Sequence, residues 1–280
     1  MTQAILASGG PGTGTSTRGP VRAGDNASTR GFRGRTPGEI RFARFAFAPN
    51  ERGLCGPDGA RSLFEHARDG VVDAELRSLA RGFEAAYPWL ELLAGSAGRA
   101  DPLDPDVVDA YWIGSPIATA TRARPLDAHL EGRFGPRLRR GSAAARRLRA
   151  LPGDEPPVHH STHVLRVLPL VGLARTGLPV ELVTVMGQCL VRPGRVSAIE
   201  GDDLLVLAPR LEEHAGRLAL VTPAIERVRR RIDGHGFVDE VEVGDLVGIH
   251  WGWAADRLEA REARALLGLT ARNLAAAELP

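Results

Sequence analysis

The sequence predicts an α+β protein, with an N-terminal, mainly helical domain followed by a small β-barrel and a C-terminal helix. Three observations lead to this prediction. Apolar residues recur with helical spacing before residue 150. From Leu178 the chain breaks into short runs rich in Val, Leu and Ile, which Gly, Pro and Asp interrupt; this is typical of a small barrel or sandwich. Helical spacing then returns after residue 255.

Length, composition and charge limit the classes of protein to which this chain can belong. The chain has 280 residues, of which 43% are hydrophobic, and this is enough for a sizeable core. All 36 basic residues are Arg. Five of them lie within residues 1–36 against a single Asp, so the net charge of +2 comes from this segment and the remainder is slightly acidic. We therefore expect no nucleic-acid partner.

Cysteine content and hydropathy indicate the compartment. Two cysteines cannot form a disulfide framework, which favours a reduced, cytoplasmic protein. The longest apolar run, "VLRVLPLVGLA", contains Arg166 and is far too short to span a membrane. The first residues lack the basic head and apolar stretch of a signal peptide. We expect a cytoplasmic protein with no membrane partner.

The N-terminal half divides into a tail and a helical domain. Residues 1–38 are rich in Gly, Ser, Thr and Arg and bury too little apolar surface to fold, so we predict a disordered tail. Residues 39–157 form the predicted helical domain. Asp73 caps a helix whose apolar stripe runs to Leu93 with a kink at Pro88, and Asp104 with Pro105 starts the next helix. Residues 125–150 carry many Arg and are predicted to be exposed.

Residues 158–185 are predicted to connect the two domains, and they contain the histidine cluster His159, His160 and His163. In a helix, His159 and His163 lie one turn apart, a spacing that can bind a metal ion. A ligand from Cys55, Cys189 or His250 would complete such a set if the domains meet there. The alternative is that these histidines pack or form hydrogen bonds at the domain junction.

Residues 186–280 are predicted to form the barrel and the C-terminal helix. The strand-like runs begin with "LPVELVTVMGQCLVRPGRVSAIE" and end with "GDLVGIHWGWA", and Pro193-Gly194 reads as a turn before a strand. Asp256 and Glu259 resemble a capping box. The helix that follows carries an apolar stripe, which consists of Ala260, Ala263, Leu267 and Leu274.

Two motifs in this region resemble a known family. "CLVRPGRV" begins at Cys189 and has the form C-L-x-x-P-G-x-V, and "VGDLVGIHWGWA" has the form G-D-x-V-x-x-H-x-G-[aromatic]-A around His250. In this order, and followed by a helix, they resemble the HypC/HupF family of [NiFe]-hydrogenase maturation chaperones over residues 186–275. The resemblance implies an OB-like β-barrel with a C-terminal helix. The whole chain also resembles an uncharacterised bacterial family associated with hydrogenase gene clusters, through "FARFAFAPNERGLCGP", "AYWIG", "HHSTHV" and "HWGWAADRL".

The resemblance implies roles for particular residues. In the HypC/HupF family, the cysteine and the histidine handle the Fe(CN)2(CO) unit, and these roles fall here on Cys189 and His250. The implied cargo is this unit or a single iron ion. The implied partners are the hydrogenase large subunit and other maturation proteins, with Pro193, Gly194, Trp251 and Trp253 as predicted contact residues. For the two tryptophans, core packing is the default interpretation and a partner-binding edge is the alternative.

The alternation of a strand adds one independent expectation. Val247, Ile249 and Trp251 share one face of the strand, so His250 points to the other face and is available as a ligand. Cys55 lies in a turn before a helix, and we expect a structural cysteine there. The alternative is a reactive cysteine or one that pairs with Cys189, because thiol pKa values fall at helix N-termini.

We therefore expect an accessory or chaperone protein for hydrogenase maturation, with no catalytic residues of its own. Two alternatives stay open. One is a metal-dependent hydrolase or redox protein that uses His159, His160 and His163 with a cysteine. The other is a structural adaptor without chemistry. The sequence contains neither the G-x-S-x-G motif of serine hydrolases nor a phosphate-binding G-x-x-x-x-G-K loop.

Overall fold

A computed structural model describes residues 35–171, 179–215 and 217–277 of the chain. The predicted disordered tail lies outside these residues, apart from its last four positions. The N-terminal region is helical, as predicted. Its helices are α1 (Gly38–Glu51), α2 (Ala60–Asp69), α3 (Ala74–Arg81), α4 (Tyr87–Ser96), α5 (Pro105–Trp112), α6 (Ala123–Phe134) and α7 (Ala143–Ala150). Short 3-10 turns lie at Pro116–Thr119, Gly135–Arg137 and Leu151–Asp154.

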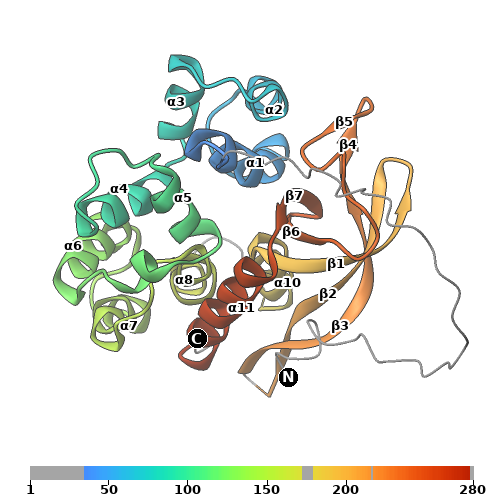
Figure 1. The fold of residues 1–280 in the computed structure, drawn as a ribbon. Helices are drawn as coiled ribbons and strands as arrows, with labels where there is room; N and C mark the ends of the chain where they lie inside the picture. The colour runs from blue at the N-terminus through green and yellow to red at the C-terminus, as the bar shows by residue number, and fades with distance from the viewer. Residues whose placement is uncertain (1–34, 172–178, 216, 278–280) are drawn as a thin grey trace, which may run out of the picture.

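Three helices lie between this region and the barrel (Figure 1). The short α8 (His160–Thr162) continues directly into a π-helical turn, His163–Val167. The others are α10 (Pro179–Cys189) and the C-terminal α11 (Ala260–Ala275). Single π-helical turns inside helices are rare and frequently occur at functional sites.

The C-terminal region is a closed barrel of five strands: β1 (Arg192–Glu200), β2 (Asp203–His214), β3 (Arg217–Arg229), β6 (Leu246–His250) and β7 (Trp253–Leu258). They are ordered β1-β2-β3-β7-β6, and β6 pairs with β1 to close the barrel. Neighbouring strands are antiparallel except for β3 and β7. The predicted barrel with a C-terminal helix is therefore confirmed, and its topology is OB-like. A separate hairpin joins β4 (Arg231–Ile232) to β5 (His235–Gly236).

The barrel core explains the position of Gly194. Val247 and Ile249 of β6 point inward and pack among Val196, Val206 and other aliphatic residues. Gly194 pairs with Val247 inside β1, where an added Cβ would lie 2.6 Å from the Ile249 side chain. The Pro193-Gly194 turn that we predicted is therefore wrong: both residues lie within a strand, and the glycine is needed because the barrel interior leaves no room for a side chain.

Three other local predictions need correction. Residues 179–189 form helix α10 and not a strand; Leu182 and Met186 pack together on one side, with Leu211 of β2. The helix predicted from Asp73 to Leu93 is two helices, because α3 ends at Arg81 and Pro88 lies in the first turn of α4.

The third correction concerns the start of α11. Its capping box uses Glu259 and Glu262, whereas Asp256 is a buried residue of β7. The predicted caps at Asp73 and Asp104 are confirmed. The Asp73 carboxylate accepts a hydrogen bond from the amide of Leu76, and the Asp104 carboxylate accepts one from the amide of Asp106.

Helix α1 joins the helical region to β6 and β7 through one apolar cluster, which is separate from the cluster inside the barrel. Phe47 of α1 packs edge-on against Trp253 of β7, with ring centroids 5.1 Å apart. Beside this contact, Arg41 and Arg44 both pair with Asp256. The predicted helical domain and the barrel are therefore packed against each other. Among the described residues, no helix is long and apolar enough to cross a membrane.

Candidate metal centre

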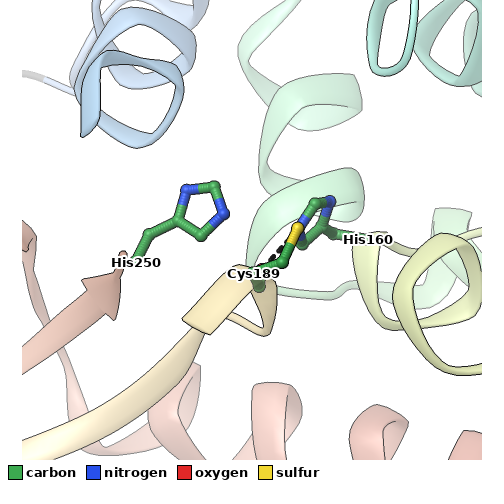
Figure 2. A group of neighbouring side chains, drawn as sticks. All are labelled: His160, Cys189 and His250. Atoms are coloured by element: carbon green, nitrogen blue, oxygen red, sulfur yellow. Dashed lines mark hydrogen bonds between the residues drawn. The ribbon is translucent and has the colours of Figure 1, made fainter. Parts of the chain in front are cut away.

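Three side chains that are far apart in sequence meet where the helices contact the barrel. His160 is the first residue of α8, Cys189 is the last residue of α10, and His250 is the last residue of β6 (Figure 2). One nitrogen of each histidine and the sulfur of Cys189 all lie within 4.8 Å of one another. Two imidazoles and one thiol at this separation form a donor set suited to a transition-metal ion.

His250 is oriented as a metal ligand would be. Its side chain is 2% exposed, and its Nδ1–H donates a hydrogen bond of 2.6 Å to the carbonyl oxygen of Phe45 in α1. Its Nε2 is buried and has no hydrogen-bond partner within the part of the chain that the structure describes. Burial lowers the pKa of His250 to about 4, so the ring is neutral and Nε2 carries a free lone pair. In metal sites, a backbone carbonyl frequently fixes a ligating histidine in this way.

His160 is held at both of its ring nitrogens. Its Nδ1 lies 3.1 Å from the hydroxyl of Tyr111, and its Nε2 lies 2.8 Å from the carbonyl oxygen of Cys189. The Nε2 atom is also 3.8 Å from Cys189 Sγ. Burial holds the pKa of His160 well below its usual value, so the ring is neutral. To bind a metal ion through Nε2, His160 has to give up the hydrogen bond from Nε2–H to the Cys189 carbonyl oxygen and change to the tautomer that carries the single proton on Nδ1, facing the Tyr111 hydroxyl.

The thiol of Cys189 is protonated in this environment. Burial raises its pKa to about 12, and the nearby Cys55 acts in the same direction. A cation bound at the centre displaces the thiol proton, since the thiolate is the form that ligates metals. Both cysteines are free.

Aromatic side chains surround the three donors. The ring of Trp112 lies 4.6 Å from His160 and 5.5 Å from His250, and it stacks on Phe45 at 5.5 Å. The two imidazoles lie 5.2 Å apart and are nearly perpendicular. This packing fixes the rotamers of the histidines and keeps their surroundings apolar, which strengthens any bond to a charged ligand.

The structure does not bring His159 and His163 into this centre. His159 has extended backbone angles because it caps α8, so it does not stack one turn before His163 as we predicted. Its Nδ1 lies 2.8 Å from the Ser161 hydroxyl and accepts a hydrogen bond from the Ser161 amide. The ring of His163 packs against Trp89 and Phe134 instead. Of the predicted cluster, only His160 joins Cys189 and His250.

The predicted partner contacts are mostly internal. Pro193 and Gly194 are buried in β1, and Trp253 is 2% exposed within an aromatic cluster of Phe47, Phe64 and Phe237. These three residues therefore leave no surface for a partner, and core packing is the correct interpretation of Trp253. Trp251 is partly exposed and lies at the tip of the turn between β6 and β7.

The structure favours a structural role for Cys55. It lies in the loop between α1 and α2, and burial raises the pKa of its thiol to about 11. Burial outweighs any effect of α2, which argues against the alternative of a reactive thiol at a helix start.

Sequence reasoning missed two residues that support the centre. Tyr111 belongs to the "AYWIG" segment and contacts His160, while the carbonyl oxygen of Phe45 belongs to "FARFAF" and orients His250. Both segments contain aromatic residues that can be recognised in the sequence, but only the fold shows that they contact His160 and His250. The face predicted for His250 is confirmed, since Val247 and Ile249 point into the barrel and His250 points toward the helices. The placement of Trp251 on the face of Val247 and Ile249 is wrong, because β6 ends at His250 and Trp251 lies in the turn that follows.

Comparisons with known proteins identify one family. The model of the family described as "Family of unknown function (DUF6390)" matches residues 34–279, which include both the helical region and the barrel. No curated protein and no solved structure matches the chain.

Proposed function

Because the chain belongs to the DUF6390 family, whose function is unknown, we propose a function from the candidate metal centre: a metal-handling accessory protein. In this proposal, Cys189, His160 and His250 hold one soft transition-metal ion. The observation that carries the proposal is the approach of these three donors to within 4.8 Å, with the Nε2 atom of His250 buried and lacking a hydrogen-bond partner among residues 35–171, 179–215 and 217–277.

The donor set supports a particular class of metal. A thiolate with two neutral imidazoles suits iron, zinc or copper, whereas magnesium and calcium require oxygen ligands. The cluster contributes a single negative charge, from the Cys189 thiolate. In apolar surroundings, one anionic ligand favours an ion of low charge or one that brings anionic ligands of its own.

The resemblance to the HypC/HupF family suggests the cargo. It points to Cys189 and His250 as the residues that handle the Fe(CN)2(CO) unit, and these two side chains lie together although 60 residues separate them along the chain. This supports iron, bound transiently as that unit or as a single ion. On the resemblance alone, we further propose that the protein is a maturation chaperone whose barrel binds the large subunit of a [NiFe]-hydrogenase. The same reasoning favours the cytoplasm, where both free thiols stay reduced.

Infrared spectroscopy tests the cargo. The full chain is co-expressed with hydrogenase maturation proteins, purified without air, and compared with Cys189→Ala. The proposal predicts bands of bound CO and cyanide in the parent protein and none in the variant. A folded parent protein without such bands, under conditions in which the co-expressed hydrogenase matures, contradicts iron-unit transport.

One observation favours a second candidate. The centre offers three protein ligands, and catalytic zinc sites use three protein ligands together with a water molecule or substrate. A metal-dependent hydrolase or redox protein would therefore use the same centre, with His160 in place of the His159 and His163 ligands expected from sequence. This candidate predicts one equivalent of zinc or iron in protein made without any hydrogenase machinery. Metal-free protein with an unchanged fold would count against it.

A further inference from the structure

A groove of about 440 Å³ lies between β3 and the C-terminal helix α11. Residues 217–223 of β3 line it without a gap, and α11 contributes Leu267, Ala271 and Leu274 among others. Successive side chains of a strand point to opposite faces, so a groove across one face would contact only every second residue. The groove therefore follows the edge of β3, and the strand backbone forms one of its walls.

Along this groove, the edge of β3 has no strand partner among the described residues. β3 pairs with β2 from Arg217 to Arg229, but with β7 only at Arg229. Figure 1 shows the β2–β3 hairpin extending past β1 and lying beside α11. Folded proteins usually keep such edges short or place charged residues on them. Residues 218–222 are instead Leu, Ala, Leu, Val and Thr, so this edge is open to another strand.

The groove is apolar along its length and carries positive charge. Ala271 and Ala275 of α11 are exposed, and their small side chains leave the groove open opposite Val221. Arg217 is the charged residue among those that line it. Arg264 is exposed and lies on the same face of α11 as Ala271, about two turns earlier in the helix. These charges favour an occupant with acidic groups.

An extended peptide fits these features better than a lipid or a second copy of the chain. A lipid chain would fill the apolar groove but leave the backbone groups of the strand edge unpaired, whereas an added strand forms hydrogen bonds with them. A second β3, paired antiparallel about the middle of the groove, would place Arg217 opposite Pro223, which has no N–H to donate. It would also bring further arginines to a surface that is already basic.

We propose that this groove binds an extended segment of a partner protein by strand addition. The segment pairs with β3 along residues 217–223, packs alternate apolar side chains against α11, and places acidic residues near Arg217 and Arg264. At about 3.3 Å per residue, this length of strand spans about 23 Å. The groove shares no residue with the candidate metal centre, so the inference goes beyond metal handling and does not depend on it.

Selection from a displayed library of random nine-residue peptides on the immobilised full-length protein tests the proposal. The enriched peptides should carry apolar residues at alternate positions and Asp or Glu at their ends. Ala271→Glu places a charged side chain in the groove and should lower the affinity for these peptides at least about tenfold. Ala260→Glu makes the same change at an exposed position of α11 outside the groove and should leave the affinity unchanged. Urea unfolding checks that both variants are folded.

A charge reversal adds a result that simple damage to the groove would not produce. When the selection is repeated on Arg217→Glu, the enriched peptides should carry Lys or Arg in place of the acidic residue at one end. The alternating apolar positions should stay the same.

Several results would overturn the proposal. One is a selection without enriched peptides; another is a set of enriched peptides that bind Ala271→Glu and Ala275→Glu as tightly as the parent protein. A parent dimer that Ala271→Glu dissociates would identify a second copy as the occupant. Peptide binding that appears only after deletion of residues 1–34 would identify the N-terminal segment of the chain itself. Metal affinity should be the same in all of these variants, so failure here leaves the proposed function standing.

Discussion

The helices meet the barrel at two junctions of opposite character. In the ionic junction, Arg41 and Arg44 of α1 bind Asp256 of β7, and Arg41 also binds Asp109 of α5 and Glu262 of α11. In the histidine junction, His160, Cys189 and His250 meet among aromatic rings, and Nε2 of His250 has no hydrogen-bond partner among the described residues. The first junction joins oppositely charged side chains of the same chain, with only Nε of Arg44 unpaired, whereas the second brings together neutral groups that can ligate a metal ion.

This difference separates a structural contact from a binding site. Buried polar atoms are nearly always paired in folded proteins, so an unpaired one in a well-packed region requires an explanation. The ionic junction holds α1 against the barrel, which places the carbonyl oxygen of Phe45 where it orients His250. The barrel alone therefore supplies only part of the centre, and the helical region supplies His160, Tyr111 and Phe45.

The largest expected effect is at the histidine junction. Cys189→Ser replaces the sulfur with an oxygen that does not ionise, so affinity for cobalt(II) or zinc should fall at least about 1,000-fold, or about 4 kcal/mol. The free energy of unfolding of the metal-free protein should change by less than about 1 kcal/mol, because the thiol makes only weak hydrogen bonds. Competition with a chromophoric chelator and urea unfolding measure the two effects. Cys55→Ser is the control and should keep the parent affinity.

The ionic junction should show the reverse pattern. Asp256→Asn leaves Arg41 and Arg44 without a shared carboxylate; the side chains of Arg41 and Asp256 are only 11% and 8% exposed. Breaking a buried pair in this way costs about 3 kcal/mol, which urea unfolding measures. Arg61→Ala, which removes an exposed pair with Glu65, should cost less than about 0.5 kcal/mol. Equal losses for the two variants would contradict the role of this junction.

Tyr111→Phe tests the support of His160. Without the hydroxyl, Nδ1 of His160 loses its partner and the ring is less firmly oriented, so metal affinity should fall about tenfold. Tyr87→Phe makes the same chemical change at the other tyrosine of the chain and should leave the affinity unchanged. An unchanged affinity in Tyr111→Phe would show that the hydroxyl does not position the ligand.

The smallest effect concerns a half-buried histidine outside both junctions. His129 packs on Trp89 at 4.5 Å, and burial lowers its pKa to about 4. As the pH falls below about 6.5, the unfolded chain takes up a proton that the folded chain refuses, so stability decreases. Between pH 7 and pH 5.5, His129 should account for a loss of about 1 kcal/mol. Urea unfolding of His129→Gln should show a correspondingly smaller dependence on pH; an identical dependence would contradict the buried, neutral state of His129.

The sequence predicted the architecture well where the pattern was local. The Gly and Pro punctuation after residue 190 indicated a barrel, and the caps at Asp73 and Asp104 were correct. The strand predicted over residues 179–189 was wrong, because a run rich in Val and Leu is compatible with either a strand or a buried helix. The spacing of Leu182 and Met186 was helical, but only their packing against Leu211 decides the matter.

The centre was predictable only in part. Cys189 and His250 could be identified as candidate ligands because each lies in a recognisable motif. The sequence did not distinguish His160 from His159 and His163. Which histidine begins the helix depends on which residue caps it, and here His159 is the cap. Tyr111 and the carbonyl oxygen of Phe45 act through long-range contacts that no local pattern encodes.

X-ray absorption spectroscopy of the zinc-loaded protein tests the central claim most directly. The account predicts one sulfur at about 2.3 Å and two imidazole nitrogens at about 2.0–2.1 Å from the zinc ion. In Cys189→Ala the sulfur signal should vanish. A first shell of oxygen and nitrogen alone in the parent protein, or a sulfur signal that persists in the variant, would contradict a metal centre formed by His160, Cys189 and His250.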